Sequence, residues 1–381
     1  MGSKRLLEFL IPAYKRPDGV RLAARSVATQ ILEFGLEEEV SIRIVDDASP
    51  NSSTSQIVES LNELVERVEV SKNVFNKGMS KNIFDMVSSS RAEFCTVLTD
   101  DDWLQPQCLP KIVQVLRELE SGSQVGGLST PRYSYLEDGS LHCVACRPFL
   151  GDRVVKASPL NAVRYCEHGF ILTGFIFRAR LMAKPAWQAS IENAYFPIIN
   201  FGIMLLENDV LFLNRNWFHH TVLNKCHWES WGANESARQT RLFRDYLKAV
   251  RIVRQNALQL DSGFIFCLLS CLAEANHIAR QLISRPLLIN ERVKHVPHEV
   301  KTSTAFQVAL FILPFGAARS FGFKISRRVL RSVNSFLARR LLAKNARAAK
   351  NAQRNKKALP VLVARSDGVP EIREKTRGIL F

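Results

Sequence analysis

Three consecutive carboxylates, Asp100, Asp101 and Asp102, follow the apolar segment 94–98 and are the sharpest candidates for chemistry. Adjacent carboxylates repel one another and resist burial, so a fold that holds them together usually adds a cation. Their hard oxygen atoms suit Mg²⁺ or Mn²⁺, which bind substrate phosphates through one or two carboxylates. The alternative is a solvated acidic turn before a helix. The position after an apolar strand favours a metal site.

Two further segments place polar residues after an expected strand. Asp46 and Asp47 end the apolar segment 40–45, where a carboxylate can accept from a nucleotide base or a ribose hydroxyl. Equally, the pair can complement the dipole of the helix that follows. Gly78 permits a tight turn, and Lys81 lies one turn into a helix whose N-terminus favours anions, which is a weaker signal.

The elements that must position these residues alternate between strand and helix over the first 130 residues. Repeated βα units with short connections predict a mostly parallel sheet covered on both faces, and ligands of such sheets gather at the carboxyl ends of the strands. The middle of the chain is less regular, and residues 236–285 have a helical pattern. The predicted strands are 6–11, 40–45, 68–70 and 94–98, and the predicted helices are 20–34, 57–65, 78–87 and 106–119.

Composition and charge exclude several classes of protein. With 46% hydrophobic residues the chain is globular rather than disordered or fibrous. No window approaches the about 18 apolar residues of a membrane span, and residues 6–12 do not form a secretory signal. The eight cysteines lack the spacing of a disulfide or zinc framework, so we expect a reduced, cytoplasmic protein.

The net charge of +16 is concentrated in the tail. From Phe315 onward there are 17 Lys/Arg against 3 Asp/Glu, so the rest of the chain is nearly neutral. Residues 325–342 have apolar and basic sides at helical spacing, and the apolar stretch 306–315 precedes them. This pattern predicts an interfacial membrane anchor at residues 301–381. Binding of nucleic acid is an unlikely alternative, and a merely solvated tail is another.

Five segments, in this order and spacing, resemble the nucleotide-sugar-binding half of a family-2 glycosyltransferase of the GT-A fold, similar to the bacterial surface-polysaccharide and O-antigen type. The resemblance covers residues 5–120 well and 125–235 loosely. The segments are Ile11-Pro12-Ala13-Tyr14-Lys15-Arg16-Pro17, Ser26-Val27-Ala28-Thr29-Gln30, Val45-Asp46-Asp47-Ala48-Ser49, Asn76-Lys77-Gly78-Met79-Ser80-Lys81-Asn82 and Leu98-Thr99-Asp100-Asp101-Asp102-Trp103-Leu104-Gln105-Pro106.

The resemblance implies a role for each matching residue. Asp46 reads the base, Asp100 approaches the ribose, and Asp101 or Asp102 holds a Mn²⁺ or Mg²⁺ ion on the diphosphate. By analogy, His227 completes the metal shell and Lys225 binds the diphosphate. The donor-binding residues implied are Pro12, Ala13, Tyr14, Arg16, Asp46, Asp47, Gly78, Lys81, Asp100 and Lys225.

The chain departs from the family at the catalytic base. Many members carry a Glu-Asp pair in the second half, and the matching stretch 190–197 has none. We expect Glu192 to be the base, with Asp209 second and Glu207 third.

The resulting expectation is a metal-dependent, inverting glycosyltransferase. It takes a sugar from a nucleoside diphosphate donor to a lipid-linked or surface-polysaccharide hydroxyl at the inner face of the cell membrane. A nucleotide-sugar-binding protein without transfer activity and a nucleotidyltransferase are the alternatives. The expected fold is α/β: a Rossmann-like GT-A domain at 1–235 (donor half 1–120, acceptor half 121–235), a helical extension at 236–300 and the basic tail at 301–381.

Overall fold

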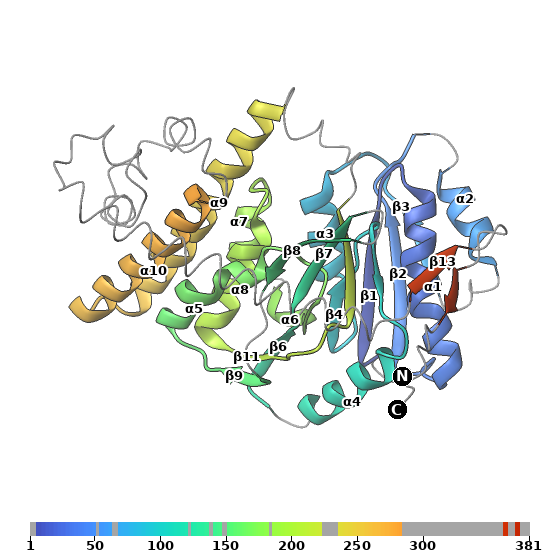
Figure 1. The fold of residues 1–381 in the computed structure, drawn as a ribbon, viewed down its shortest axis with the longest axis horizontal. Helices are drawn as coiled ribbons and strands as arrows, with labels where there is room; N and C mark the ends of the chain where they lie inside the picture. The colour runs from blue at the N-terminus through green and yellow to red at the C-terminus, as the bar shows by residue number, and fades with distance from the viewer. Residues whose placement is uncertain are drawn as a thin grey trace, which may run out of the picture. The chain divides into compact units, whose positions relative to one another are not determined.

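One sheet with the strand order β3-β2-β1-β4-β10-β6-β11-β9 organises the described part of the chain (Figure 1). Strands β1, β2, β3, β4, β6 and β11 run parallel, β10 runs antiparallel between β4 and β6, and β9 is an antiparallel edge. Their bounds are β1 Leu7–Ala13, β2 Val40–Asp46, β3 Val68–Lys72, β4 Phe94–Val97, β6 Val125–Ser129, β9 Arg153–Val155, β10 Phe175–Arg178 and β11 Asp209–Phe212.

This computed structural model describes residues 5–50, 53–62, 68–120, 123–136, 140–146, 151–182, 185–222, 235–283, 361–364 and 370–373. The chain divides into two compact units, Met1–Ile325 and Ser326–Phe381. In the second unit, β13 (Val361–Ala364) pairs antiparallel with β14 (Pro370–Arg373). The amphipathic segment predicted at 325–342 lies outside the described residues. Among the helices that are described, none has both the length and the apolar character needed to cross a bilayer.

Helices cover both faces of the sheet because β1 alternates its side chains between them. Phe9 and Ile11 pack on one side, against α1 (Pro17–Phe34), α2 (Ser53–Ser60) and α4 (Leu109–Glu120). Leu10 packs on the other side, against α3 (Met79–Ser88). The sequence predicted these helices and strands to within a few residues, and the predicted α/β sheet is confirmed.

Strand β1 continues through Pro12 to Ala13, whereas the sequence predicted an end at Ile11. The carbonyl of Leu10 accepts from Leu98, so Leu10 and Pro12 turn their backbone polar groups toward β4. The ladder with β4 stops at Leu10, and the missing N–H of Pro12 therefore removes no hydrogen bond from the sheet.

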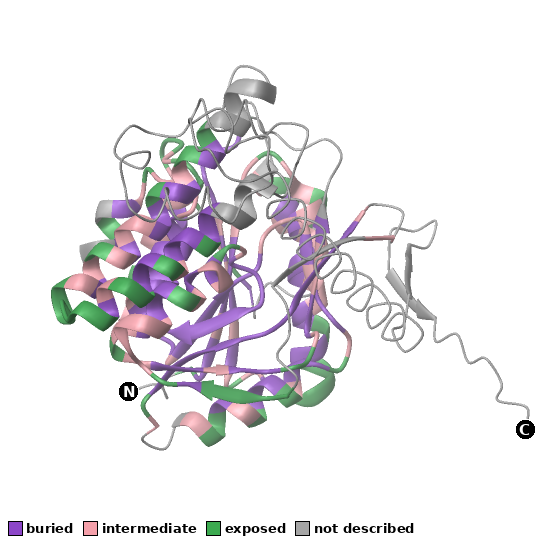
Figure 2. Cartoon of the chain, turned by 60° about the vertical axis from the view of Figure 1, so that its left-hand side comes forward, coloured by how far each residue is buried: buried purple, intermediate pink, exposed green. Residues whose placement is uncertain are grey.

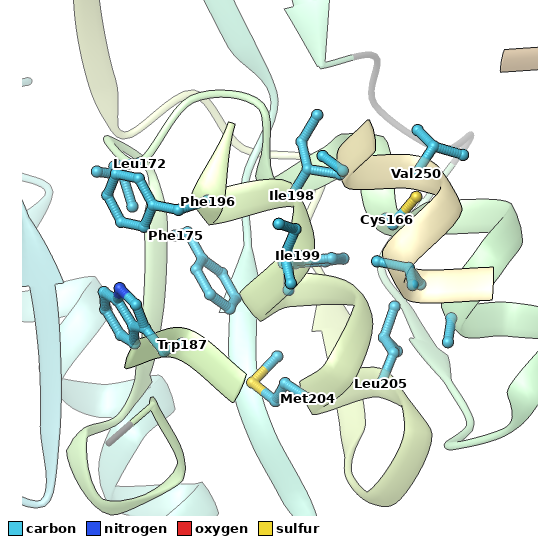
Figure 3. Close-up of a cluster of buried hydrophobic side chains, with 14 of the residues drawn as sticks. Cys166, Leu172, Phe175, Trp187, Phe196, Ile198, Ile199, Met204, Leu205 and Val250 are labelled. Carbon is cyan, nitrogen blue, oxygen red and sulfur yellow. The ribbon is translucent and has the colours of Figure 1, made fainter. Parts of the chain in front are cut away.

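The face of the sheet that carries Leu10 packs against a further layer of helices. This layer contains α5 (Pro159–Tyr165), α6 (Ala179–Met182), α7 (Pro185–Ser190), α8 (Phe196–Glu207), α9 (Glu235–Leu260) and α10 (Phe264–Ile283), with a short 3-10 turn at Cys166–Gly169. Figure 3 shows Phe175 of the sheet beside Phe196, Ile199 and Met204 of α8, with Val250 of α9 farther to the right, near Cys166. The predicted helical extension thus shares its core with the sheet.

A second, smaller sheet was not predicted. Its order is β5-β12-β7-β8, with β5 Asp102–Leu104, β7 Arg132–Leu136, β8 Leu141–Cys146 and β12 Phe218–Val222. Asp102, the last of the three consecutive acidic residues, therefore pairs with His220, and the next residue, Trp103, pairs with His219.

Helix α1 holds the acidic segment from behind. A Cβ at Gly19 would lie 2.0 Å from the carbonyl oxygen of Asp100, so only glycine allows this approach. Ser26 Oγ accepts from Leu104 N–H (3.0 Å). The buried Gln30 amide donates to the Gln105 carbonyl and accepts from two N–H groups at the start of α4. Three residues of one helix thus fix both ends of the segment 100–109.

Candidate functional site

Four loops meet at the carboxyl end of the parallel strands, after β1, β2, β3 and β4. The loops after β1 and β2 are joined directly, because Lys15 N–H donates to Ser49 Oγ (2.8 Å) and Asp47 N–H donates to the Ala13 carbonyl (2.8 Å). Lys15 and Ala48 both have positive φ, at 60° and 54°. Such backbone is unfavourable for these residue types and persists only where the surroundings impose it. The predicted donor-binding residues Pro12, Ala13 and Tyr14 lie in this joined region.

Asp46 is fully buried and both of its oxygens already have partners. Oδ1 accepts from the N–H (3.1 Å) and hydroxyl (2.5 Å) of Ser49, and Oδ2 accepts from the Thr54 hydroxyl, with Lys72 Nζ at 3.9 Å. These contacts build the turn after β2. The structure therefore gives Asp46 a clear supporting role, and its reading of a base stays a prediction.

Asp47 organises the next loop. Its carboxylate accepts from Asn73 Nδ2 (2.8 Å), from Lys77 N–H (2.9 Å) and from Gly78 N–H (2.8 Å). Gly78 has φ 81° and stands immediately before α3, so the carboxylate fixes the entry to that helix. Lys81, predicted to bind phosphate, is paired with Asp85 at 2.5 Å.

Asp100 and Asp101 share one cation. Arg16 Nη1 lies 2.9 Å from Asp100 Oδ1 and 3.8 Å from Asp101 Oδ2. Burial raises the pKa of Asp100 to about 7, with Asp101 and Asp102 adding to the rise and Arg16 opposing it. Burial and the neighbouring Asp102 also raise the pKa of Asp101. Both carboxyl groups therefore take up a proton more readily than usual unless a further cation stabilises their charged form.

Asp102 differs from its two neighbours because its carboxylate is fully engaged. Oδ1 lies 2.8 Å from His220 Nδ1 and accepts from Thr221 N–H (3.0 Å), while Oδ2 accepts from Thr99 Oγ1 (2.7 Å). Its side chain has no exposed surface. Burial lowers the pKa of His220, but the Asp102 carboxylate and Asp101 raise it further, so the net shift is upward. These bonds tie β5 to β12 and leave Asp101 as the triplet's better metal ligand.

The other side of this small sheet carries an aromatic stack. The ring of His219 lies between Trp103 and Tyr135, with centroids 3.7 Å and 4.3 Å away. Burial lowers the pKa of His219 to about 4, so its ring is neutral near pH 7. A neutral, sandwiched ring packs as an aromatic residue and binds no proton at working pH.

Sequence reasoning missed two residues beside the acidic segment. His220 was overlooked in favour of His227, although its alternation with His219 in a strand could have signalled it. Arg132 is buried, donates from Nε to the Thr173 carbonyl (2.9 Å) and from Nη1 to Ser129 Oγ (3.0 Å), and has no partner for Nη2 among the described residues. No sequence signal distinguishes it from other arginines.

The candidates for the catalytic base are separated by the fold. Glu192 is exposed in the turn before α8. Because α8 leads back to the start of β11, this turn lies at the helix end nearer the carboxyl edge of the sheet. Asp209 is the first residue of β11 and lies beside the first residue of β6, at the amino-terminal edge of the parallel strands; Glu207 comes just before it in the chain. Asp46 ends β2 at the opposite, carboxyl edge, so about 20 Å along the strand direction separates Asp209 from the level of Asp46.

Asp209 is therefore not part of the site, and neither is Glu207. The Asp209 carboxylate accepts from Ala157 N–H and Lys156 Nζ, both at 2.8 Å, which explains its burial. Both residues stand at the opposite edge of the sheet from the four loops, so the fold does not favour either as the base, and these assignments stay predictions. Lys225 and His227 lie outside the described residues.

The carboxylate oxygens at this site are suitable ligands for a divalent cation. In the part of the chain that the structure describes, no three His, Cys, Asp or Glu side chains gather into a metal centre. Mg²⁺ and Mn²⁺ nevertheless commonly use one or two carboxylates and take the remaining ligands from water and substrate phosphate. Asp101, half-buried and incompletely neutralised by Arg16, provides such a ligand.

Comparisons with known proteins show what this part of the chain resembles. The family model described as glycosyl transferase family 2 matches residues 8–152, which include all four loops. No curated protein sequence matches the chain significantly. Solved structures that resemble it include S. aureus TarS 1-349 with UDP (TM-score 0.45, 17% identity, 76% of this chain and 88% of that chain covered) and with UDP-GlcNAc (0.43, 16%, 76% and 88%). Another is the mannosyltransferase PcManGT from Pyrobaculum calidifontis with GDP-Man and Mn²⁺ (0.42, 13%, 81% and 86%). Over residues 8–152, the chain therefore resembles glycosyltransferase family 2.

Proposed function

We propose that the protein transfers a sugar, in a metal-dependent and inverting reaction, from a nucleoside diphosphate donor to an acceptor hydroxyl. The observation that carries this proposal is the acidic pair Asp100 and Asp101, held beside Arg16 where the loops after β1, β2 and β4 meet. The match of residues 8–152 to the glycosyl transferase family 2 model supports glycosyl transfer. The charge of the pair supports the metal.

The donor lies, in this proposal, across the joined loops. The half-buried Tyr14 and Arg16 face the nucleoside with Pro12 and Ala13 behind them, and Asp100 approaches the ribose. Asp46 and Asp47 shape the pocket by fixing the turns after β2 and β3. Gly78 and Lys81 stand at the start of α3, where backbone N–H groups favour the negative charge of a phosphate.

Asp101 holds the metal in this proposal, with Lys225 and His227 as further candidate contacts from outside the described residues. The donor set suits Mn²⁺ or Mg²⁺ equally. When bound, the ion stabilises the charge that develops on the leaving nucleoside diphosphate. Asp102 supports the site from behind by holding His220 and Thr221 in the second sheet.

Glu192 is the base that we propose for the acceptor hydroxyl. It is the remaining predicted carboxylate once Asp209 and Glu207 are removed, and its turn lies toward the carboxyl edge of the sheet. A base on the face opposite the leaving group gives inversion by direct displacement.

The acceptor that we propose is a lipid-linked or surface-polysaccharide hydroxyl at the inner face of the cell membrane. The support comes from the sequence, where the tail carries +14 of the net charge beside the apolar stretch 306–315. Such a tail concentrates a cytoplasmic protein at an anionic leaflet.

Calorimetric titration with UDP, GDP, CDP and dTDP, with and without Mn²⁺, tests the donor site. We expect one nucleotide to bind in a metal-dependent manner and Asp101→Ala to abolish that dependence. Glu33→Ala removes an exposed carboxylate elsewhere on α1 and serves as the control. Sugar transfer to an acceptor pool then separates an enzyme from a protein that only binds the donor. Release of pyrophosphate from a nucleoside triphosphate indicates nucleotidyl transfer and contradicts the proposal.

A further inference from the structure

Helix α10 carries more of the exposed large hydrophobic side chains than any other described helix. We call the surface that these side chains form the α10 face. Its members are Phe264 (83% exposed), Ile265 (71%), Leu268 (51%), Leu269 (41%) and Leu272 (43%). They recur at the spacing of one helical side, so they form a continuous stripe rather than scattered exposed residues. A stripe of this kind on a soluble domain marks an interaction surface.

The stripe is most exposed where the hairpin between α9 and α10 turns. Leu260, the last residue of α9, is 62% exposed and faces the same turn as Phe264. Farther along α10 the helix is anchored, because Phe266, Ala275 and Ile278 pack into the core shared with α5 and α9. Figure 2 shows exposed positions on the outer sides of helices and buried strands at the centre. The turn itself is polar and exposed at Asp261, Ser262 and Gly263, and Leu260 and Phe264 place apolar surface on either side of it.

No charged residue interrupts the stripe. Between Phe264 and Asn276 the only one is Glu274, which is buried and paired with Arg254 at 3.0 Å. Moving this side of α10 out of water therefore does not require burial of an unpaired charge.

A basic side chain, Arg164, stands beside the stripe. Leu269 and Leu272 line a groove of about 290 Å³ with Leu160 and Arg164 of α5, and no acidic residue lines it. Arg164 is exposed. An apolar surface bordered by a cation is complementary to acyl chains bordered by phosphates.

We propose that the α10 face, with its groove against α5, is a membrane-contact surface that inserts into the interface of an anionic phospholipid bilayer. The apolar side of α10 enters the acyl boundary, and Arg164 binds lipid phosphate at the groove. The chain continues from α10 into the segment with the basic tail, so a second attraction to the same leaflet follows in sequence. This surface is distinct from the tail and does not depend on the proposed sugar transfer.

Vesicle co-sedimentation of the full-length protein tests the proposal, using phosphatidylcholine vesicles with and without phosphatidylglycerol. Phe264→Gln with Ile265→Gln should lower binding on the order of tenfold or more, because two largely exposed side chains lose their burial in lipid. Leu269→Gln should lower it about threefold. Leu32→Gln on α1, where Leu32 is also 41% exposed, is the matched control and should bind as the unmodified protein does. Arg164→Gln should weaken binding only to the anionic vesicles, and added salt should weaken it as well.

Three results overturn the proposal. The first is vesicle binding of the Phe264/Ile265 variant equal to that of the unmodified protein. The second is a change of the sedimenting mass of the variant without lipid, which assigns the surface to a second copy of the chain. The third is a lower melting temperature of the variant with unchanged vesicle binding, which assigns the surface to a later segment of the same chain. Donor binding by this variant should be unchanged, and Asp101→Ala should bind vesicles normally, so failure here is distinguishable from failure of the proposed transfer.

Discussion

Replacing Asp101 or Asp102 by alanine should have opposite consequences, although the two residues are adjacent. Asp101 is partly exposed, repelled by Asp102 and only 3.8 Å from its nearest cation, so its removal relieves repulsion. We expect Asp101→Ala to keep the free energy of unfolding of the unmodified protein and to lose metal-dependent nucleotide binding. Asp102 has no exposed surface, and its removal exposes three donors to an empty space.

The magnitude for Asp102→Ala follows from those three donors. Thr99 Oγ1 retains a contact with Thr173 Oγ1 at 3.3 Å, so its loss is small. Thr221 N–H and His220 Nδ1 lose their acceptor. Each buried unsatisfied group costs about 1–3 kcal/mol, so the variant should lose about 4 kcal/mol of unfolding free energy. That is a large part of the 5–15 kcal/mol that typically stabilises a folded domain.

Urea denaturation followed by tryptophan fluorescence measures this difference, and calorimetric titration with nucleotide and Mn²⁺ measures binding. Asp102→Asn is the informative partner variant, because its amide oxygen still accepts from Thr221 and most of the stability should return. If Asp102→Ala unfolds at the same urea concentration as the unmodified protein, the carboxylate does not support the second sheet. Equal destabilisation by Asp101→Ala would contradict the assignment of different roles.

Three further outcomes are expected. Glu192→Gln should abolish sugar transfer while keeping donor binding, whereas Asp209→Asn should keep transfer and lower the melting temperature; a transfer assay and a thermal scan separate them. His277 is 1% exposed, with Nε2 2.8 Å from a carbonyl oxygen and Nδ1 3.1 Å from the Glu167 carboxylate, so both nitrogens act as donors. Burial lowers its pKa, but Cys166 and Glu167 raise it to about 10. The stabilisation should be complete below its ordinary value of 6.5 and decline as pH rises toward 10, which denaturation at several pH values measures; a flat profile contradicts it. Gly19→Ala should weaken donor binding, because the added Cβ pushes the Asp100 backbone away from α1. Unchanged nucleotide affinity in calorimetric titration would show that the close contact between Gly19 and Asp100 does not matter for the site.

The elements of the main sheet were predictable because their signals are local. Strand β2 alternates buried and half-buried residues, and α1 repeats Val20, Ala24, Val27 and Ile31 on its buried side. The second sheet gave no such signal. Strand β5 has three residues, and its partner β12 lies more than a hundred residues later. Pairing over such a separation depends on how the whole domain folds, and a three-residue segment has no periodicity to detect.

The candidate site was predictable to a similar extent. The residue types that could bind a donor or a metal stand directly after predicted strands, so the carboxyl-edge rule located Asp46, Asp47 and Asp100. It could not show that the Asp102 carboxylate is hydrogen-bonded to His220, because that contact joins two segments far apart in the sequence. Nor could it exclude Asp209, since only the parallel register of β11 with β6 places that residue at the far edge of the sheet.

The contacts of α1 with the acidic segment also set how this helix can change in length. Gly19, Ser26 and Gln30 are separated by seven and four residues, which is close to whole numbers of helical turns, so all three face the same way. One residue inserted between Gly19 and Gln30 turns one end by about 100° relative to the other. Either Asp100 then loses its close approach or the start of α4 loses its buried amide. Insertions and deletions should therefore be tolerated beyond Gly35, where the helix has ended, and rejected within this stretch.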